Sequence, residues 1–289
     1  IQGNIRNYGT GEVRFEAPQI TPESTATKPS EVYKPGATLD RTLEYGGKTV
    51  PIYRDRPLNV FSDVDFIWTD EENENQRRLE YLGGEFRTRY GIDVSSFQGE
   101  IDWDAVADDN IDFAMVRVGF RGTGTGSLNT DKYYEQNIRG AMRAGLETGV
   151  YFFAQAVTVE EAIEEADYVI SLLDGLDING PVAYDWEMHD STYRVYGTSP
   201  EMATACAVAF CERIKDAGYT PMVYGGTYVT YMKYDQGALA DYLSWYPEYK
   251  SEKSEKLCPT LVYHMDYWQF SSSCTVDGIG GRVDGNIQF

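Results

Sequence analysis

The chain has 289 residues, of which 42% are hydrophobic and 25% charged, so it can bury one large core or two smaller ones. Its 46 acidic residues outnumber 25 Lys and Arg, and the resulting formal net charge of −21 argues against nucleic acid and anionic membrane surfaces as partners. No run of eighteen apolar residues occurs, so we expect no membrane insertion within this chain.

The first 89 residues are predicted to form an N-terminal extension without a core of its own. Residues 21–30 (TPESTATKPS) have the composition of a linker or tether. Residues 46–65 alternate enough to suggest a small hairpin, and residues 69–82 are predicted to form a short charged helix with Thr69 or Asp70 as its N-cap. We expect this extension to pack on or tether the remainder, and a chain that starts near Arg87 to fold and act without it.

Residues 90–289 show a different pattern, in which short apolar runs are separated by helical stretches. The runs predict eight strands, at residues 90–97, 112–120, 148–156, 180–188, 220–226, 243–249, 260–270 and 281–289. Amphipathic helices are predicted between the early strands, at residues 132–144, 159–173 and 202–217. The later connections are too short for full helices. This alternation predicts an α/β fold, an irregular (β/α) TIM-like barrel with helices mainly in the first five connections.

Acidic residues end several of the predicted strands. Asp185 and Glu187 lie two residues apart in AYDWEM, so both face the same side of the fourth strand at its C-terminal end, where barrel active sites are built. Asp93 ends the first strand, Asp284 lies in the last, and Asp266 is expected at the end of the seventh but is left out of the catalytic set. Converging carboxylates raise one another's pKa and leave a protonated acid beside ionised neighbours, as glycosidic bond cleavage requires. A structural carboxylate pair bonded to backbone is the alternative.

Five separated motifs resemble, in the family's order, the glycoside hydrolase family 25 lysozymes, the Chalaropsis-type N-acetylmuramidases. They are YGIDVSSFQGEIDW, GVYFFAQA, AYDWE, WQFS and GIGGRVDGNIQF, within residues 90–289. The resemblance implies an irregular (β/α) barrel that cleaves the β-1,4 bond between N-acetylmuramic acid and N-acetylglucosamine in peptidoglycan. It further implies that Glu187 is the general acid and Asp185 its partner, with Asp93 and Asp284 as further acids of the site. Residues 1–89 have no counterpart in it.

The spacing of Asp185 and Glu187 favours substrate assistance over direct attack by a carboxylate. A displacing carboxylate sits across the sugar from the acid, and a neighbour two residues along one strand is poorly placed for that. A 2-acetamido group can supply its own nucleophile, and Asp185 would then orient and stabilise the acetamido nitrogen. We expect retention of configuration, with inversion as the alternative.

Substrate binding is assigned to aromatic residues that end strands at the predicted mouth, together with one arginine. Flat aromatic faces suit stacking on sugar rings, although aromatic residues at strand ends also serve as core. An arginine within a strand is costly to bury unpaired, so we expect it to meet one of the site acids. The candidates are Arg117, Tyr151, Tyr224, Trp245 and Trp268.

Other chemistries lack their signatures in this chain. His189 and His264 are the only histidines and have no metal-binding spacing, so neither a metal nor a cofactor is expected. The RGTGTG stretch at residues 121–126 follows a strand but has no Lys-Ser/Thr and no immediate helix, which favours a mouth loop over a phosphate cradle.

Four cysteines are too few for a scaffold built on disulfides. Cys206 and Cys211 fall in a helical pattern and are expected to be free thiols in the core. Cys258 and Cys274 flank a strand-like run, and they either bridge or remain free, depending on export.

Two functional classes stay open. The first is an active muramidase, secreted or held at the cell surface, whose partner is the glycan strand of peptidoglycan. The second is a non-catalytic protein on the same barrel that binds or attaches to cell-wall glycan. The set of site carboxylates favours the enzyme, because a binding protein has no need of a buried protonated acid.

Overall fold

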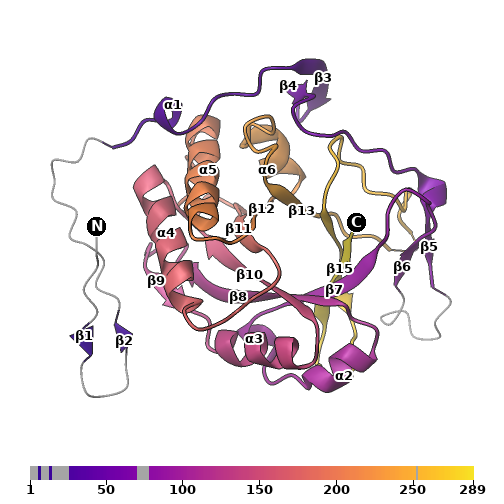
Figure 1. Ribbon diagram of the computed structural model, residues 1–289. Helices are drawn as coiled ribbons and strands as arrows, with labels where there is room; N and C mark the ends of the chain where they lie inside the picture. Colours follow the sequence, from indigo (N-terminus) through magenta and orange to yellow (C-terminus); the bar gives the residue numbers. More distant parts are fainter. Residues whose placement is uncertain (1–5, 8–12, 15–25, 70–77, 252) are drawn as a thin grey trace.

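The structure, a computed structural model, describes residues 6–7, 13–14, 26–69, 78–251 and 253–289 (Figure 1). Strands β1 (Arg6–Asn7) and β2 (Val13–Arg14) pair with each other in a small antiparallel sheet of their own. Residues 21–25 of the predicted linker at 21–30 lie outside the described residues. Its last two residues begin the short helix α1 (Pro29–Val32).

Among the described residues, eight strands close into the barrel that the apolar runs predict. Neighbouring strands from β7 to β14 are parallel, and the ring is completed by β15, which is antiparallel to both β14 and β7. Strand β9 (Leu128–Thr130) lies outside the ring and forms a hairpin with β8. The barrel strands are β7 (Arg89–Val94), β8 (Phe113–Arg121), β10 (Glu147–Ala154), β11 (Val182–Trp186), β12 (Pro221–Tyr224), β13 (Leu243–Pro247), β14 (Tyr267–Cys274) and β15 (Val283–Gln288).

Helices occupy the connections between the earlier strands, as predicted. Two of the longer ones begin at hydroxyl N-caps: Thr158 accepts a hydrogen bond from the backbone N–H of Glu161 at 3.3 Å, and Ser199 accepts one from Met202 at 3.2 Å. The helices are α2 (Trp103–Asp108), α3 (Tyr134–Arg143), α4 (Val159–Leu172), α5 (Pro200–Asp216) and α6 (Thr227–Met232).

The connection between β13 and β14 corrects the prediction for the seventh strand. That strand begins at Tyr267, so residues 260–266 precede it and Asp266 lies at its N-terminal end, away from the mouth. Asp266 accepts hydrogen bonds there from the backbone N–H and hydroxyl of Ser244, at 2.7 and 3.0 Å. The apolar alternation of residues 260–266 comes from packing against the extension. Leu261 and Tyr263 are buried, and Tyr263 pairs with Leu58 of the extension in an isolated bridge.

Between α1 and the barrel, the described part of the extension contains two further antiparallel strand pairs, and both differ from the prediction. Strands β3 (Leu39–Tyr45) and β4 (Lys48–Tyr53) form the first, which begins earlier than the predicted range of 46–65 and turns at two glycines with φ of +56° and +74°. Strands β5 (Phe66–Trp68) and β6 (Leu79–Tyr81) form the second. The helix predicted at residues 69–82 is therefore wrong at its C-terminal end; residues 70–77 lie outside the described part.

The extension packs against the barrel where the last connections lack helices among the described residues. Phe66 and Leu79 are buried, and the ring of Phe66 lies edge-on to that of Trp268, with centroids 5.3 Å apart. Val50 and Ile52 of the first hairpin are buried in the same continuous core. Figure 1 shows the extension running around the outside of the barrel from α5 to β7. It thus covers apolar surface that helices cover elsewhere in the fold.

A buried arginine also ties the extension to the barrel. The guanidinium of Arg56 donates hydrogen bonds to the side chain of Gln236 at 3.1 Å and to the carbonyl oxygen of Tyr242 at 3.3 Å. Burial lowers the pKa of Arg56, although the charge of Asp266 opposes that effect. Removing such a group leaves its buried partners unsatisfied, so the extension is held by polar contacts as well as by apolar ones.

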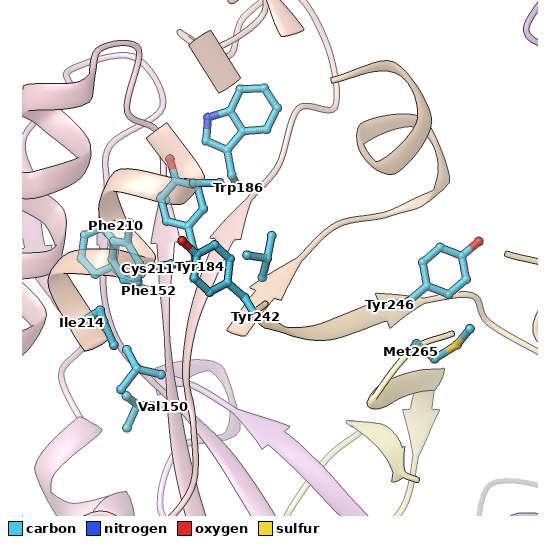
Figure 2. Close-up of a cluster of buried hydrophobic side chains, with 14 of the residues drawn as sticks. Val150, Phe152, Tyr184, Trp186, Phe210, Cys211, Ile214, Tyr242, Tyr246 and Met265 are labelled. Carbon is cyan, nitrogen blue, oxygen red and sulfur yellow. The ribbon is translucent and has the colours of Figure 1, made fainter. Parts of the chain in front are cut away.

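Alternating side chains of the barrel strands form two cores. The inner one fills the barrel and contains Phe113, Met115, Ala183, Met222, Tyr224, Trp245 and Tyr267. The outer one lies between the strands and their cover, and Figure 2 shows part of it, with Tyr184 of β11 beside Phe210 and Cys211 of α5. All four cysteines are buried and free, as expected for Cys206 and Cys211, so Cys258 and Cys274 do not bridge in this structure.

Candidate active site

Strand β11 places two acids inside the barrel mouth. Its even-numbered residues Tyr184 and Trp186 belong to the outer core, whereas Ala183 belongs to the inner one. The two-residue repeat of a strand therefore directs Asp185 inward, and Glu187 follows in the same phase just past the last strand residue. Asp185 is 5% exposed, and the side chain of Glu187 is 27% exposed, so the second acid faces solvent and the first lies beneath it.

Asp185 and Glu187 interact directly. Burial, the charge of Glu187 and a hydrogen bond shared with Glu187 raise the pKa of Asp185 well above its usual value, with a further contribution from Asp93. A hydrogen bond between two carboxyl groups requires a proton on one of them. The Oδ1 atom of Asp185 is buried and has no hydrogen-bond partner among the described residues.

The two remaining predicted acids come from the antiparallel pair β7 and β15. Asp93 and Asp284 lie opposite each other in the ladder. Burial and the charge of Asp284 raise the pKa of Asp93 well above its usual value, and burial together with Glu187 raises that of Asp284 to about 6. Because these shifts depend on carboxyl groups from both sides of the barrel, the structure brings all four predicted acids together.

Gln269 joins Asp93 to Asp284. Its side-chain amide N–H groups donate to Oδ2 of Asp93 at 2.8 Å and to Oδ2 of Asp284 at 3.0 Å. Its amide oxygen accepts hydrogen bonds from the phenols of Tyr224 at 3.2 Å and Tyr249 at 3.1 Å. These donors fix the orientation of the amide, so that its nitrogen faces the carboxylates.

Asn286 gives Asp93 a second amide donor, at 2.8 Å from Oδ2. Its own oxygen accepts a hydrogen bond from the indole N–H of Trp245 at 2.8 Å. The residue-by-residue assignment overlooked Gln269 and Asn286, although both lie within the quoted motifs. Strand alternation could have identified both residues. Asn286 is two residues after Asp284 and so shares its strand face, and Gln269 faces the opposite side from the apolar tryptophan before it.

Among the described residues Arg117 forms its ion pair outside the predicted acids, although its charge opposes the burial that raises the pKa of Asp185. Its guanidinium pairs with the buried carboxylate of Asp131, with nitrogen–oxygen distances of 2.8 and 2.9 Å, and donates to the hydroxyl of Ser96 at 3.2 Å. It also lies over the rings of Phe97 and Phe120, 5.1 and 5.5 Å from their centroids. The acid was missed because it belongs to the loop after β9, outside the strand pattern.

The predicted aromatic residues divide into two groups. Tyr151 and Tyr224 lie inside the barrel near the acids. The charge of Asp93 contributes to the raised pKa of Tyr151, and the charge of Glu187 contributes to that of Tyr224. Trp245 packs edge-on to both tyrosines, with centroids 5.7 and 4.9 Å apart, but is only 2% exposed. It supports the tyrosines and cannot present a ring face to a sugar, contrary to its assignment.

Trp268 does not line the mouth, so its assignment to substrate binding is wrong. Its side chain is 0% exposed and belongs to the outer core. The indole N–H donates to the carbonyl oxygen of Glu248 at 3.0 Å, and the ring packs against Phe66 and Phe270. Gln269, the next residue, takes the inward position, because successive side chains of a strand face opposite sides.

The loop after β11 is anchored to the neighbouring connection. The side-chain amide of Gln155 donates to the carbonyl oxygen of Glu187 at 2.8 Å. Arg194 donates to the carbonyl oxygen of Gln155 at 2.9 Å and pairs with Glu161 at 2.7 Å. Residues 121–126 form the turn between β8 and β9, and Arg194 donates from its backbone N–H to Thr123 at 2.9 Å. These contacts fix the backbone at Glu187.

We predict that Gln269→Leu lowers kcat by about 10- to 100-fold. The variant removes the donor shared by Asp93 and Asp284, and a hydrogen bond to a charged group contributes about 1.5–3 kcal/mol. Gln288→Leu is the matched control, because Gln288 is also on the inner face but bonds to Tyr267 at the opposite end of the barrel, at 2.9 Å. Steady-state kinetics on peptidoglycan measure the effect; equal activity of the two variants would contradict the role of Gln269.

The site acids also predict how stability changes with pH. A carboxyl group whose folded pKa exceeds its unfolded value stabilises the folded state at low pH, and this contribution is lost as pH rises through the folded pKa. For Asp284 the window runs from the ordinary value of 3.8 to about 6. We therefore expect Tm to fall as pH rises from 3.8 to about 6, and to fall less in Asp284→Asn. Parallel Tm curves for wild type and variant would refute this assignment.

Neither a metal cluster nor a membrane helix emerges from the described residues. Within them, no group of three or more His, Cys, Asp or Glu side chains is positioned to hold a metal ion. In the same part of the chain, no helix combines the length and apolar composition needed to cross a bilayer.

Carboxyl groups converge at the mouth of an irregular β/α barrel, an arrangement that suits acid-catalysed cleavage of a glycosidic bond. The family model described as Glycosyl hydrolases family 25 matches residues 92–279 of the chain. The chain belongs to this family.

Individual relatives are similar over the barrel. The autolytic lysozyme of Clostridium acetobutylicum is 26% identical over 195 residues, covering 67% of this chain and 54% of that protein. Lysozyme M1 of Streptomyces globisporus is 27% identical over 201 residues, covering 68% of this chain and 66% of that protein. The chain thus spans about half the length of the clostridial relative.

Solved structures show the same fold. The bacterial lysozyme of Streptomyces coelicolor superposes with a TM-score of 0.55 at 25% identity, covering 70% of this chain and 92% of that one. The spore cortex lytic enzyme SleM of Clostridium perfringens superposes with a TM-score of 0.60 at 23% identity, covering 70% of this chain and 67% of that one.

Proposed function

We propose that the protein is a muramidase that hydrolyses the β-1,4 bond between N-acetylmuramic acid and N-acetylglucosamine in peptidoglycan. The observation that carries the proposal is the placing of Asp185 and Glu187 on the inner face of β11 at the barrel mouth of a family 25 chain. The names of the relatives, an autolytic lysozyme and lysozyme M1, support the same substrate. Because peptidoglycan lies outside the cytoplasmic membrane, the protein would act as a secreted or surface enzyme.

The first chemical step uses the proton shared by the acid pair. Glu187, which faces solvent, transfers a proton to the glycosidic oxygen as the bond from C1 to that oxygen breaks. The carbonyl oxygen of the substrate's 2-acetamido group forms a new bond to C1 and closes a cyclic oxazolinium. Asp185 becomes ionised, accepts a hydrogen bond from the acetamido N–H and balances the positive charge.

The free Oδ1 atom of Asp185 supports this role for it. That atom is buried without a partner among the described residues, so an acetamido N–H would satisfy an acceptor that is otherwise unpaired. In the second step Glu187 takes a proton from water, whose oxygen attacks C1 and opens the ring. Two displacements at C1 restore the β configuration.

Asp284, beside Asp93, would supply negative charge next to the oxocarbenium-like centre. Gln269 holds their facing oxygen atoms at 2.8 and 3.0 Å, so the charge is already positioned before substrate arrives. Tyr151 and Tyr224 lie near the same acids and would contact the sugar.

Digestion of purified peptidoglycan tests the proposed activity. New reducing ends should be N-acetylmuramic acid, identified by borohydride reduction and mass spectrometry. Reducing-end N-acetylglucosamine would overturn the bond specificity. The absence of any new reducing ends would favour the glycan-binding alternative, and release of stem peptides alone would place the activity in another class.

The role of Asp185 gives a separate prediction. Asp185→Asn cannot balance the oxazolinium charge and should lower kcat by about 10²- to 10³-fold, as the loss of one electrostatic stabiliser does. Proton NMR of the first-formed product of the wild type should show the β anomer. An initial α anomer would mean inversion, with a carboxylate activating water.

A further inference from the structure

A second cavity lies between the extension and the barrel, outside the catalytic mouth. It has a volume of about 420 Å³. One wall comes from the extension, at Tyr33, Lys48 and Tyr53, and the other from the barrel, at Glu201 of α5 and Tyr231 of α6. Figure 1 shows the extension passing by α5 and α6 on its way to the β3–β4 hairpin. The volume lies in the range of small-molecule binding sites in proteins.

The two walls of this interdomain cavity are fixed to each other. The backbone N–H of Gly36 donates to Oδ2 of Asp235 at 3.0 Å, and that of Tyr53 donates to the phenol of Tyr263 at 3.0 Å. Gly36 and Gly237 approach so closely that a Cβ on Gly237 would overlap the Cα of Gly36. The cavity is therefore a built feature, and larger side chains at these two glycines would separate its walls.

The lining combines flat rings with hydroxyl and carboxylate oxygens. Five tyrosines line it, of which Tyr33 and Tyr53 are half-buried and can present a ring face, whereas the other three are buried and support them; three prolines add apolar surface. Asp235 and Glu201 supply acceptors, while Lys48 is the one cation in the described lining. Rings pack against the C–H faces of pyranoses, and carboxylates and phenols bond to sugar hydroxyl and amide groups.

We propose that this interdomain cavity is an auxiliary site for N-acetylated hexosamine glycan. The proposal rests on the proposed function, because its ligand is a more distant part of the same polymer. The cavity would hold one part of the glycan strand while the barrel mouth cleaves another part of it. This raises the effective concentration of scissile bonds at the mouth. The family match begins at residue 92, so the extension wall lies outside the matched region. Tyr234 of the lining also packs on Trp186, with centroids 6.1 Å apart, which places the cavity behind strand β11.

Binding is tested with the full chain carrying Glu187→Gln, so that turnover does not consume the ligand. The probe is insoluble peptidoglycan from which stem peptides have been removed with an amidase. Adding Tyr53→Ala, or separately Glu201→Gln, should weaken binding at least fivefold, with Tm unchanged. Tyr228→Ala is the matched control, since Tyr228 is 46% exposed on α6 and outside the lining. It should bind as the parent does.

A kinetic measurement separates this site from the catalytic one. In the otherwise unchanged enzyme, Tyr53→Ala should raise KM on insoluble peptidoglycan at least fivefold and leave kcat/KM on a soluble muropeptide tetrasaccharide unchanged. Unaltered binding by both Tyr53→Ala and Glu201→Gln, or binding that depends on stem peptides, would overturn the auxiliary site. Failure of the wild type to cleave either substrate would instead overturn the proposed function, while the binding result would stand.

Discussion

Glu187→Gln should lower kcat on peptidoglycan by about 10²- to 10⁴-fold or more while leaving the fold and glycan binding intact. The amide has nearly the shape of the acid but cannot deliver a proton to the glycosidic oxygen. The backbone at this position is held by Gln155 at 2.8 Å through the carbonyl oxygen, and that contact does not depend on the side chain. Release of reducing ends over time measures kcat, and thermal unfolding confirms that the fold is kept.

Asp190→Asn is the control for this experiment. Asp190 lies in the same loop, three residues further on, and is exposed, so its carboxyl group is outside the buried cluster. The control should have near wild-type activity. A Glu187→Gln enzyme that retains activity within tenfold of the wild type would remove Glu187 from the role of general acid.

The second large effect concerns the extension. A chain that starts at Arg87 should fail to fold, because it loses the cover formed by Val50, Ile52, Phe66 and Leu79. Burying one such side chain contributes about 1.5–3 kcal/mol, so the four together approach the whole stability of a typical domain, about 5–15 kcal/mol. Circular dichroism and a thermal melt measure the outcome. This prediction reverses the expectation drawn from the motif positions.

Two controls make the truncation informative. A chain that starts at Ala26 keeps every side-chain contact described above and should fold normally. Phe66→Ala in the full chain should cost about 3–5 kcal/mol, because it leaves a cavity against Trp268. A soluble and cooperatively folded product from Arg87 onward would show that the barrel core is complete without the extension.

The barrel could be predicted because its strands are apolar runs interrupted by clear helical periods. Asp185 and Glu187 could be predicted because they interrupt one of these apolar runs, and burying charge inside a strand is costly unless it has a function. Asp93 and Asp284 were also predicted from their positions in the first and last strands, and the family resemblance added their roles as acids of the site. The structure now explains their selection, because β7 and β15 set them opposite each other.

The wrong predictions concern residues whose inward or outward position depends on the strand register, or whose burial depends on a contact far away in the sequence. Trp268 and Gln269 are neighbours, and a shift of one position in a strand exchanges the inner and outer faces. The strand that contains them begins at Tyr267, a boundary that the apolar residues 260–266 concealed. Phe66 and Leu79 sit in strands of three residues, too short to show a period, and their burial depends on partners about 200 residues away.

The reversed direction of β15 determines where the chain leaves the molecule. Asp284 lies near the start of that strand, at the mouth, so the strand runs away from the acids and Gln288 pairs with Arg89 at the opposite end. Phe289 is fixed there by a hydrogen bond from its backbone N–H to Asp266 at 2.9 Å. A tether joined after Phe289 would thus hold the enzyme by the end of the barrel opposite the acids. Coupled to a solid support in this orientation, the enzyme would present its open mouth to the solution.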